Sequence, residues 1–400
     1  MENACCIVGL GAISSIGLDV EENYESLQSL QSGISYPEFL QTLHKTDLPV
    51  CEIKKSDAEL AALCKMPLGL PRTVYLSAIA VQQTLAVIAN HDMSKLRIGF
   101  ISGNTIGGMD RSEYFFTDYL QNQSQGQLQD IRYHECGSIT ELVAKHFGIK
   151  HFVTTINTAC SSSANAMIHA SRLLKNNKLD IVIAGGADAL CRFTLNGFNT
   201  LMILDSEPSK PFDENRKGLN LGEGAAYLML TSEAIRSEYN LHKYATLSGY
   251  ANANDAFHQT ASSAEGNGNY QAMKEALAMT GLTTSDIHYI NAHGTGTGNN
   301  DASEGIAIQR LFGENIPPVS STKANTGHTL GACGALEAVY ACLALQHQVI
   351  FPNLRFETQM KELNFSPNTK WQATKNMQHI MSNSFGFGGN CTSLIFSKDS

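Results

Sequence analysis

The sequence predicts an α/β fold built from two halves, residues 1–240 and 241–400. A chain of 400 residues exceeds the length at which a single hydrophobic core stops growing. Hydrophobic residues make up 43% of the chain and charged residues 16%, which is typical of a packed globular protein rather than a disordered one. Short β-branched runs alternate with longer helical patterns, and this alternation restarts in the second half.

In the first half, short runs rich in β-branched and apolar residues predict buried strands at residues 6–8, 97–102, 152–157 and 181–184. Segments with helical periodicity lie between them, at residues 72–90 and 162–174. Residues 110–140 are polar and irregular, and the glutamine-rich run at 121–127 predicts a solvated loop.

The second half repeats this alternation. Strands are predicted at residues 245–249, 288–291 and 318–321, and helices at residues 270–279, 301–312 and 331–348. A final hairpin is predicted from residues 380–383 and 392–397.

Charge and cysteine usage exclude several classes of protein. A net charge of -9 disfavours a nucleic-acid binder, because neutralising phosphates needs a basic surface. Residues 1–8 carry an acid and no base, unlike a secretory signal, and no apolar run reaches the ~20 residues that cross a bilayer. The ten cysteines contain no Cys-x-x-Cys pair and are expected to be reduced. A soluble, cytoplasmic protein is therefore expected.

One cysteine lies in a segment of small polar residues, Asn157-Thr-Ala-Cys-Ser-Ser-Ser163. Cys160 follows a predicted strand and precedes a predicted helix, so it is expected at the N-terminus of that helix. The helix dipole and the free N–H groups there would lower the pKa of the thiol. A buried structural cysteine is the alternative reading, and the strand-to-helix junction favours a nucleophile over it.

Two histidines lie in loops rich in glycine and threonine, Asn291-Ala-His-Gly-Thr-Gly-Thr297 and Lys323-Ala-Asn-Thr-Gly-His-Thr-Leu-Gly-Ala332. Taken singly, His293 and His328 would more often be structural residues. With Cys160 they form a set suited to acyl-thioester chemistry, in which a thiol holds an acyl group and imidazoles bind an oxyanion. A zinc site is disfavoured because no short-spaced pair of ligands anchors it.

These three segments, together with Asn383-Ser-Phe-Gly-Phe-Gly-Gly389, resemble the β-ketoacyl-acyl-carrier-protein synthases of the elongating, Cys-His-His type. The resemblance covers the whole chain. It implies a thiolase-like fold of two similar five-layered α/β halves (αβαβα), and a homodimer or a heterodimer with a related ketosynthase-like subunit. It also implies that no cofactor is bound, since acyl groups arrive on the phosphopantetheine of acyl carrier protein.

The resemblance implies a role for each member of the set. Cys160 would attack the acyl-carrier thioester and form an acyl-enzyme. His293 and His328 would bind the carbonyl of a malonyl thioester and stabilise the enolate that decarboxylation releases. The enolate would then attack the acyl group on the cysteine and form a carbon–carbon bond.

Three further residues receive roles from the same resemblance. Lys323 would supply a fixed positive charge and would be held by Glu304. Phe387 would act as a gate for the acyl chain, and its backbone N–H would form an oxyanion hole with that of Cys160. A core aromatic is the alternative reading for Phe387.

The chain departs from the family pattern at several points. Asn390-Cys391 replaces the usual Thr-Asn pair, which puts the hydrogen bond of that amide in doubt. Ser112 stands where relatives place larger apolar residues, which suggests a deeper or more polar tunnel. These differences favour a specialised aryl-polyene or polyketide-like pathway. The predicted substrate pocket comprises Ser112, Leu219, Thr295 and Thr297.

An acidic carrier protein needs basic contacts on an enzyme that is itself acidic. The candidate patch is Lys65, Arg72, Arg216 and Lys217, with scattered solvated side chains as the alternative. Three competing functions remain: a thiolase, a non-catalytic chain-length partner and a cysteine hydrolase of another fold. Cys160 argues against the second, and His328 and the place of Cys391 argue against the first.

Overall fold

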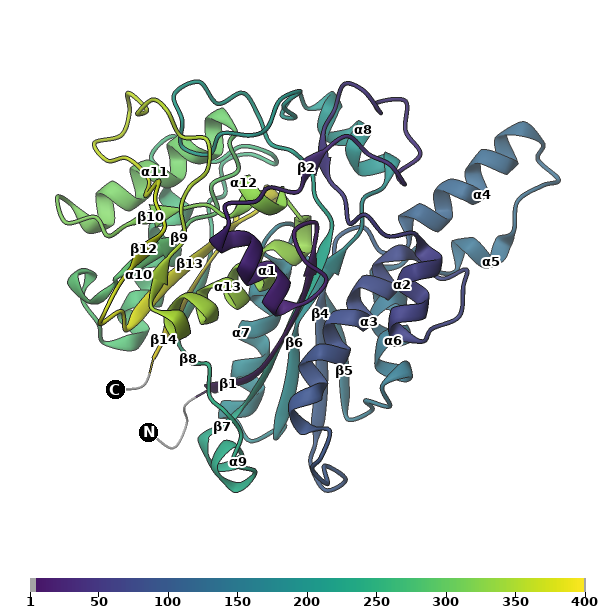
Figure 1. The fold of residues 1–400 in the computed structure, drawn as a ribbon, viewed down its shortest axis with the longest axis horizontal. Coiled ribbons are helices and arrows are strands. Elements are labelled where there is room, and N and C mark those ends of the chain that lie inside the picture. The colour runs from purple at the N-terminus through teal and green to yellow at the C-terminus, as the bar shows by residue number, and fades with distance from the viewer. Residues whose placement is uncertain (1–4, 399–400) are drawn as a thin grey trace.

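A computed structural model describes residues 5–398. Residues 1–4, whose composition argued against a secretory signal, lie outside the described residues, as do residues 399–400. Within the described part, no helix is both long and apolar enough to span a membrane. Ten strands form one sheet in the order β10-β9-β13-β14-β8-β1-β7-β6-β4-β5 (Figure 1).

The first half contributes five strands to this sheet, β1 (Cys5–Ser14), β4 (Ile98–Gly103), β5 (Phe152–Ile156), β6 (Ile181–Asp188) and β7 (Gly224–Ser232). Its helices are α1 (Val20–Gln28), α2 (Asp57–Cys64), α3 (Arg72–Leu85), α4 (Met109–Gln121), α5 (Leu128–Ile131), α6 (Cys136–His146), α7 (Ser162–Lys175), α8 (Arg192–Thr200) and α9 (Glu233–Glu238). A small separate sheet pairs β2 (Ile34–Ser35) with β3 (Val50–Cys51).

The second half contributes the other five, β8 (Ala245–Asn254), β9 (Tyr289–Asn291), β10 (Val319–Ser320), β13 (His379–Phe385) and β14 (Asn390–Ser397). Its helices are α10 (Asn267–Thr280), α11 (Gly298–Phe312), α12 (Lys323–Thr326) and α13 (Cys333–His347). Another small sheet pairs β11 (Val349–Ile350) with β12 (Gln372–Ala373).

The two halves share one topology. In the first, the strand order from the outer edge is β5-β4-β6-β7-β1, and in the second it is β10-β9-β13-β14-β8. The three outer strands of each half are parallel and the last two pairings are antiparallel. A short antiparallel pairing of β1 with β8 joins the half-sheets. The predicted two-half α/β architecture is confirmed.

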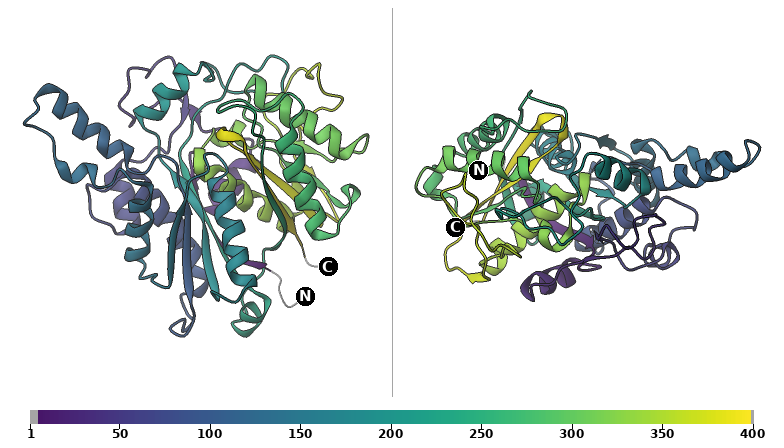
Figure 2. Two further views of the ribbon diagram at one scale, coloured as in Figure 1. Left: turned by 180° about the vertical axis from the view of Figure 1, so that it is seen from behind. Right: turned by 90° about the horizontal axis from the view of Figure 1, so that it is seen from above.

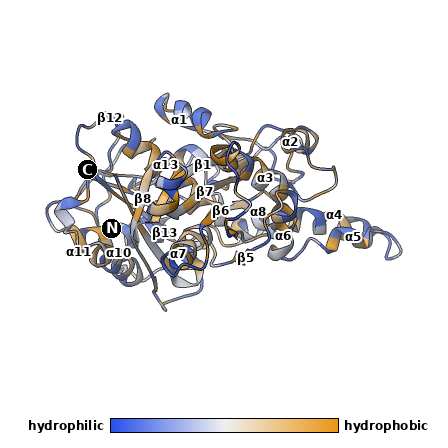
Figure 3. Ribbon diagram, turned by 90° about the horizontal axis from the view of Figure 1, so that it is seen from below, coloured by the Kyte–Doolittle hydropathy of each residue, from blue (hydrophilic) through white to orange (hydrophobic). Residues whose placement is uncertain are grey.

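The helices complete five layers. Helices α7 and α13 lie between the half-sheets and contact strands of both, while α3 and α6 cover the outer face of one half and α10 and α11 lie outside the other (Figures 1 and 2). Every residue of α13 from Cys333 to Leu345 is buried, as expected for a helix that is apolar all round. By contrast, α1 at the surface is mainly hydrophilic (Figure 3).

One prediction for the first half is wrong, and one strand was not predicted. Residues 110–140 are not an irregular loop: α4 and α5 form a hairpin that projects from the body, and only residues 122–127 link them (Figure 1). Phe115 stacks on Tyr119 one turn later, with ring centroids 5.7 Å apart, so α4 carries an apolar stripe that its polar composition obscured. Strand β7 was not predicted, although its continuous apolar run is typical of a strand that is buried on both faces.

Candidate active site

Cys160 lies in the tight turn between β5 and α7. The preceding residue, Ala159, has a φ of +51°, in the left-handed region that non-glycine residues rarely adopt. The hydroxyl of Ser162 accepts the backbone N–H of Thr158 (2.9 Å) and helps to close this turn. Strained backbone of this kind persists only where the surrounding structure holds it, and it is common at functional sites.

His328 occupies the corresponding turn of the second half, between β10 and α13. Because the halves repeat one topology, the two middle-layer helices bring Cys160 and His328 together at their N-termini. Nε2 of His328 lies 3.1 Å from Sγ of Cys160. The backbone N–H of Leu330 donates to Nδ1 of His328 (3.1 Å), so the neutral ring carries its proton on Nε2. His328 is therefore a hydrogen-bond donor toward the thiol.

His293 follows β9 and takes the same tautomer. Lys323 donates from Nζ to Nδ1 of His293 (3.2 Å) and to its carbonyl oxygen (2.7 Å), which leaves the proton on Nε2. The rings of His293 and His328 are nearly perpendicular, with centroids 5.3 Å apart. The structure thus brings together the cysteine, both histidines and the lysine that the sequence singled out.

The pairing predicted for Lys323 is wrong. Its ammonium group forms a buried ion pair with Glu337 of α13, not with Glu304. Burial opposes the charge on Lys323, but Glu337 outweighs that effect and raises the pKa of Lys323 above its ordinary value. Glu337 is a single acid within the otherwise apolar helix α13, and this feature of the sequence could have identified it as the partner of Lys323.

Glu304 instead holds the loop that carries His293. Its carboxylate accepts the backbone N–H groups of His293 (2.9 Å) and Gly294 (2.8 Å). Asp301, one turn earlier on α11, accepts the N–H groups of Thr295 (2.9 Å) and Gly296 (3.1 Å). Sequence reasoning missed Asp301, although two acids three residues apart near the start of a helix point the same way.

Burial sets the electrostatics of the site. Together with the charge of Lys323, it holds the pKa of His293 and His328 well below 6.5, so both rings are neutral. Burial also raises the pKa of Cys160 to about 11, although Lys323 and the N–H groups of Phe387 and Cys160 act in the opposite direction. The expected lowering of the thiol pKa is therefore wrong: desolvation outweighs the helix N-terminus.

Two cavities meet at Cys160. One, of about 150 Å³, is lined by Leu219, Thr295 and Thr297 together with both histidines. The other, of about 210 Å³, is largely apolar, and Met109 lies in its wall. The rings of Phe387 and Phe198 stack with centroids 5.7 Å apart and line both cavities. Phe198 was not anticipated from the sequence.

Ser112, predicted to line the substrate pocket, does not face either cavity. It is buried on α4, and its hydroxyl bonds Nδ1 of His134 (3.0 Å). Ser112 lies three residues after Met109, so the two side chains lie on only approximately the same side of α4. The hydrogen bond to His134 decides where the Ser112 hydroxyl points. Met109 takes the place that Ser112 was expected to fill.

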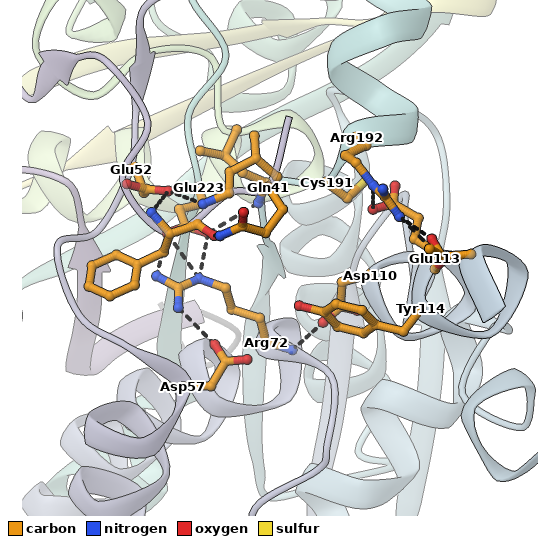
Figure 4. Close-up of a pocket in the computed structure, with 14 residues that line it drawn as sticks. Gln41, Glu52, Asp57, Arg72, Asp110, Glu113, Tyr114, Cys191, Arg192 and Glu223 are labelled. Atoms are coloured by element: carbon orange, nitrogen blue, oxygen red, sulfur yellow. Dashed lines mark hydrogen bonds and ion pairs between the residues drawn. The ribbon is translucent and has the colours of Figure 1, made fainter. Parts of the chain in front are cut away.

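The four residues predicted to form a basic patch, Lys65, Arg72, Arg216 and Lys217, do not form one. Arg72 lines a separate cavity of about 370 Å³ and forms ion pairs with Glu223 (2.7 Å) and Asp57 (2.8 Å). Figure 4 shows how these side chains point toward one another. Arg216 is half-buried and donates to backbone carbonyls of Asp213, Thr297 and Gly298. The bonds of Arg216 hold neighbouring loops together. Only Lys65 and Lys217 are exposed.

The donor atoms of Cys160, His293 and His328 lie within 4.8 Å of one another, a spacing that a metal ion could also use. Both histidines accept hydrogen bonds at Nδ1, so both Nε2 atoms carry protons and are donors rather than ligands.

Cys391 is the residue that a thiolase would need as its second catalytic cysteine. Its thiol bonds Asn269 (3.1 Å), and it is absent from the lining of both cavities.

Comparison with known proteins identifies the family of this chain. Residues 76–234 match the N-terminal domain of the β-ketoacyl synthases, and residues 244–357 match the C-terminal domain. The chain is 30% identical to 3-oxoacyl-[acyl-carrier-protein] synthase 2 of Vibrio cholerae, over 98% of both proteins.

Two solved structures extend the likeness to the whole fold. A ketosynthase in complex with its chain length factor, from Xenorhabdus doucetiae, is 31% identical, with a TM-score of 0.86 over 99% of this chain and 98% of that one. The ishigamide ketosynthase/chain length factor is 26% identical, with a TM-score of 0.93 over 100% of both chains. These matches confirm the resemblance in the sequence motifs: the chain belongs to the β-ketoacyl synthase family and is a transferase.

Proposed function

We propose that the chain extends an acyl group by decarboxylative Claisen condensation, as a β-ketoacyl-[acyl-carrier-protein] synthase. The observation that carries this proposal is one buried thiol beside two neutral imidazoles that both present Nε2–H. This set offers a nucleophile for a thioester and a pair of donors for an enolate oxygen. No bound cofactor takes part, since the acyl groups arrive on the phosphopantetheine arm of the carrier.

In the first step, Sγ of Cys160 attacks the thioester carbonyl of the acyl carrier. The C–S bond to the carrier breaks, and the thiol proton leaves with the carrier as its free thiol. The backbone N–H groups of Cys160 and Phe387 both lower the pKa of the Cys160 thiol, which places them near Sγ, where the oxyanion of the tetrahedral intermediate would form. The product is an acyl-enzyme.

In the second step, a malonyl carrier places its thioester carbonyl against Nε2–H of His293 and His328. Cleavage of the C–C bond releases CO₂, and its electron pair becomes the enolate, whose oxygen the two donors stabilise. The enolate carbon attacks the acyl carbonyl on Cys160. The C–S bond breaks, the thiolate regains a proton, and the β-ketoacyl carrier leaves.

The two cavities suit the two parts of such a substrate. The more polar of the two cavities, with Thr295 and Thr297, would take the carrier arm, and the largely apolar cavity with Met109 would take the acyl chain. The stacked rings of Phe387 and Phe198 stand between them and would have to separate for a chain to pass. An aryl-polyene or polyketide-like pathway is the finer proposal, supported by the similarity to ketosynthases described with chain length factors.

The partners are an acyl carrier protein and a second ketosynthase-like subunit, identical or related. Among the described residues, β5 pairs only with β4, and all five of its residues are partly exposed. An open strand edge of this kind is a template for pairing with another chain. Exposed Lys217 lies at the cavity beside Cys160, where a carrier would deliver its arm.

Decarboxylation should not follow the ordinary titration of histidine. Both rings are already neutral, with their pKa held well below 6.5 by burial, so the rate of CO₂ release should stay flat between about pH 8 and pH 6. Because the pKa of each histidine is lower in the folded than in the unfolded state, the free energy of unfolding is highest above the unfolded pKa. It falls as the pH drops below that value, where the unfolded state binds protons that the folded state does not. A half-maximal loss of rate near the ordinary histidine pKa would contradict the neutral-donor assignment.

The proposal is tested by mixing the purified protein with malonyl carrier and a series of saturated and polyunsaturated acyl carriers. The expected result is an acyl adduct at Cys160, release of CO₂ and a β-ketoacyl product, measured by intact-protein mass spectrometry. Free acid without CO₂ would indicate a hydrolase instead. A clear preference for saturated chains would remove the specialised pathway and leave the condensation standing.

A further inference from the structure

Asn390 connects the two turns that carry the proposed oxyanion hole. Asn390 opens β14, directly after the 3₁₀ turn Phe387–Gly389. Its carbonyl oxygen accepts the N–H of Gly386 (2.9 Å), which closes the turn around Phe387. The backbone of Asn390 thus fixes one of the two N–H donors.

The side chain of the same residue reaches the other turn. Oδ1 of Asn390 accepts the hydroxyl of Ser161 (2.6 Å), the residue directly after Cys160. It also accepts the side-chain amides of Asn165 on α7 (2.9 Å) and Asn252 on β8 (2.7 Å). A single amide oxygen therefore joins three elements at the point where the two halves of the molecule meet.

The neighbours of Asn390 are themselves held in place. Asn165 donates to the hydroxyl of Thr158 in the Cys160 turn (2.8 Å), and its own Oδ1 accepts Thr392 on β14 (3.0 Å). Asn252 also donates to Thr392 (2.8 Å). A threonine at this position would carry its side-chain oxygen one bond closer to the backbone and could not place it at the same point. The network is therefore built for asparagine.

We infer that Asn390 is a positioning residue that sets the spacing between the backbone N–H donors of Cys160 and Phe387. The inference rests on the proposed function, in which those donors stabilise the tetrahedral intermediates at the acyl carbonyl. His293 and His328 belong to other loops, so the stabilisation of the malonyl enolate does not depend on Asn390. The two half-reactions should respond differently when its side-chain oxygen is removed.

The test compares Asn390→Leu, which removes the acceptor at similar size, with Asn390→Asp, which keeps it. Acyl transfer to Cys160 from an acyl carrier, followed by rapid-quench mass spectrometry, should slow about 10- to 100-fold in the leucine variant. The aspartate variant should recover most of that loss. Asn315→Leu, an exposed asparagine in the loop before β10, is the matched control for the substitution itself.

CO₂ release from malonyl carrier is measured in parallel, with and without Asn390→Leu, in a Cys160→Ala background that cannot be acylated. It should change less than about twofold, because a shift of the N–H donors does not reach the imidazoles. Equal loss in both half-reactions, loss of the native oligomeric state, or unchanged acylation in the leucine variant would each overturn the inference. A wild-type protein that no acyl carrier acylates would remove the proposed function, and this inference with it.

Ser161→Ala keeps the inference testable if Asn390→Leu does not fold. It deletes the hydroxyl that bonds Asn390, from the opposite turn. Acylation should slow in this single variant, and unchanged acylation would overturn the inference. Where Asn390→Leu does fold, the two substitutions together should cost less than the product of their separate effects, because both break one contact. Strictly multiplicative effects would count against a shared role.

Discussion

Replacing Cys160 with alanine is expected to abolish the acyl-enzyme and to lower condensation by a factor on the order of 10⁴ or more. No other described thiol lines the cavities that meet at this position, so nothing can replace the nucleophile. The measurement is the mass shift of the intact protein after incubation with an acyl carrier, together with the yield of β-ketoacyl product. Cys160→Gln should release CO₂ from malonyl carrier without condensation.

Cys391→Ala is the matched control for the loss of a buried thiol. Cys391 is 2% exposed, and its thiol bonds Asn269 rather than facing the acyl cavities. Acylation of Cys160 should therefore persist in this variant. If Cys391→Ala stopped condensation while the acyl-enzyme still formed, the thiolase reading would return.

The parts of the site that could be predicted are those in which local sequence sets local geometry. Cys160, His293 and His328 each follow a strand in a segment of small residues, and such segments let backbone approach a substrate closely. The repeated strand–helix order then places the Cys160 and His328 turns at equivalent positions of the two halves. The fold alone therefore brings Cys160 and His328 together, without any further signal in the sequence.

The parts that could not be predicted depend on burial and long-range pairing. Burial of the turn, which only the tertiary structure defines, raises the pKa of Cys160 and outweighs the lowering by Lys323 and by the N–H groups of Phe387 and Cys160. Arg72 was expected on the surface because arginine is usually exposed. Its ion pair with Glu223, which is distant in the sequence, instead holds it in the interior. Glu304 was predicted to hold Lys323, but the packing of α13 brings Glu337 to the ammonium group instead.

Lys323→Met is expected to separate the role of this lysine in the site from its role in the core. Loss of Nζ removes the donor that fixes the proton of His293 on Nε2. Only His328 then presents a fixed Nε2–H donor to the enolate oxygen, so CO₂ release should fall by a factor of about 10² to 10³. The hydrogen bond between His328 and Cys160 does not involve the lysine, so acylation should fall much less.

The same substitution leaves Glu337 buried without its countercharge, and one of its oxygens already has no partner among the described residues. The free energy of unfolding should drop by about 3–5 kcal/mol, measured by chemical denaturation.

Lys323→Met combined with Glu337→Leu removes both charges. Because two apolar side chains can replace a buried ion pair at little cost, the double variant should regain stability. It should not regain CO₂ release, since the donor to His293 is still missing. Full recovery of both properties would mean that Lys323 acts only through the stability of the core, and the fixed tautomer of His293 would then need another cause.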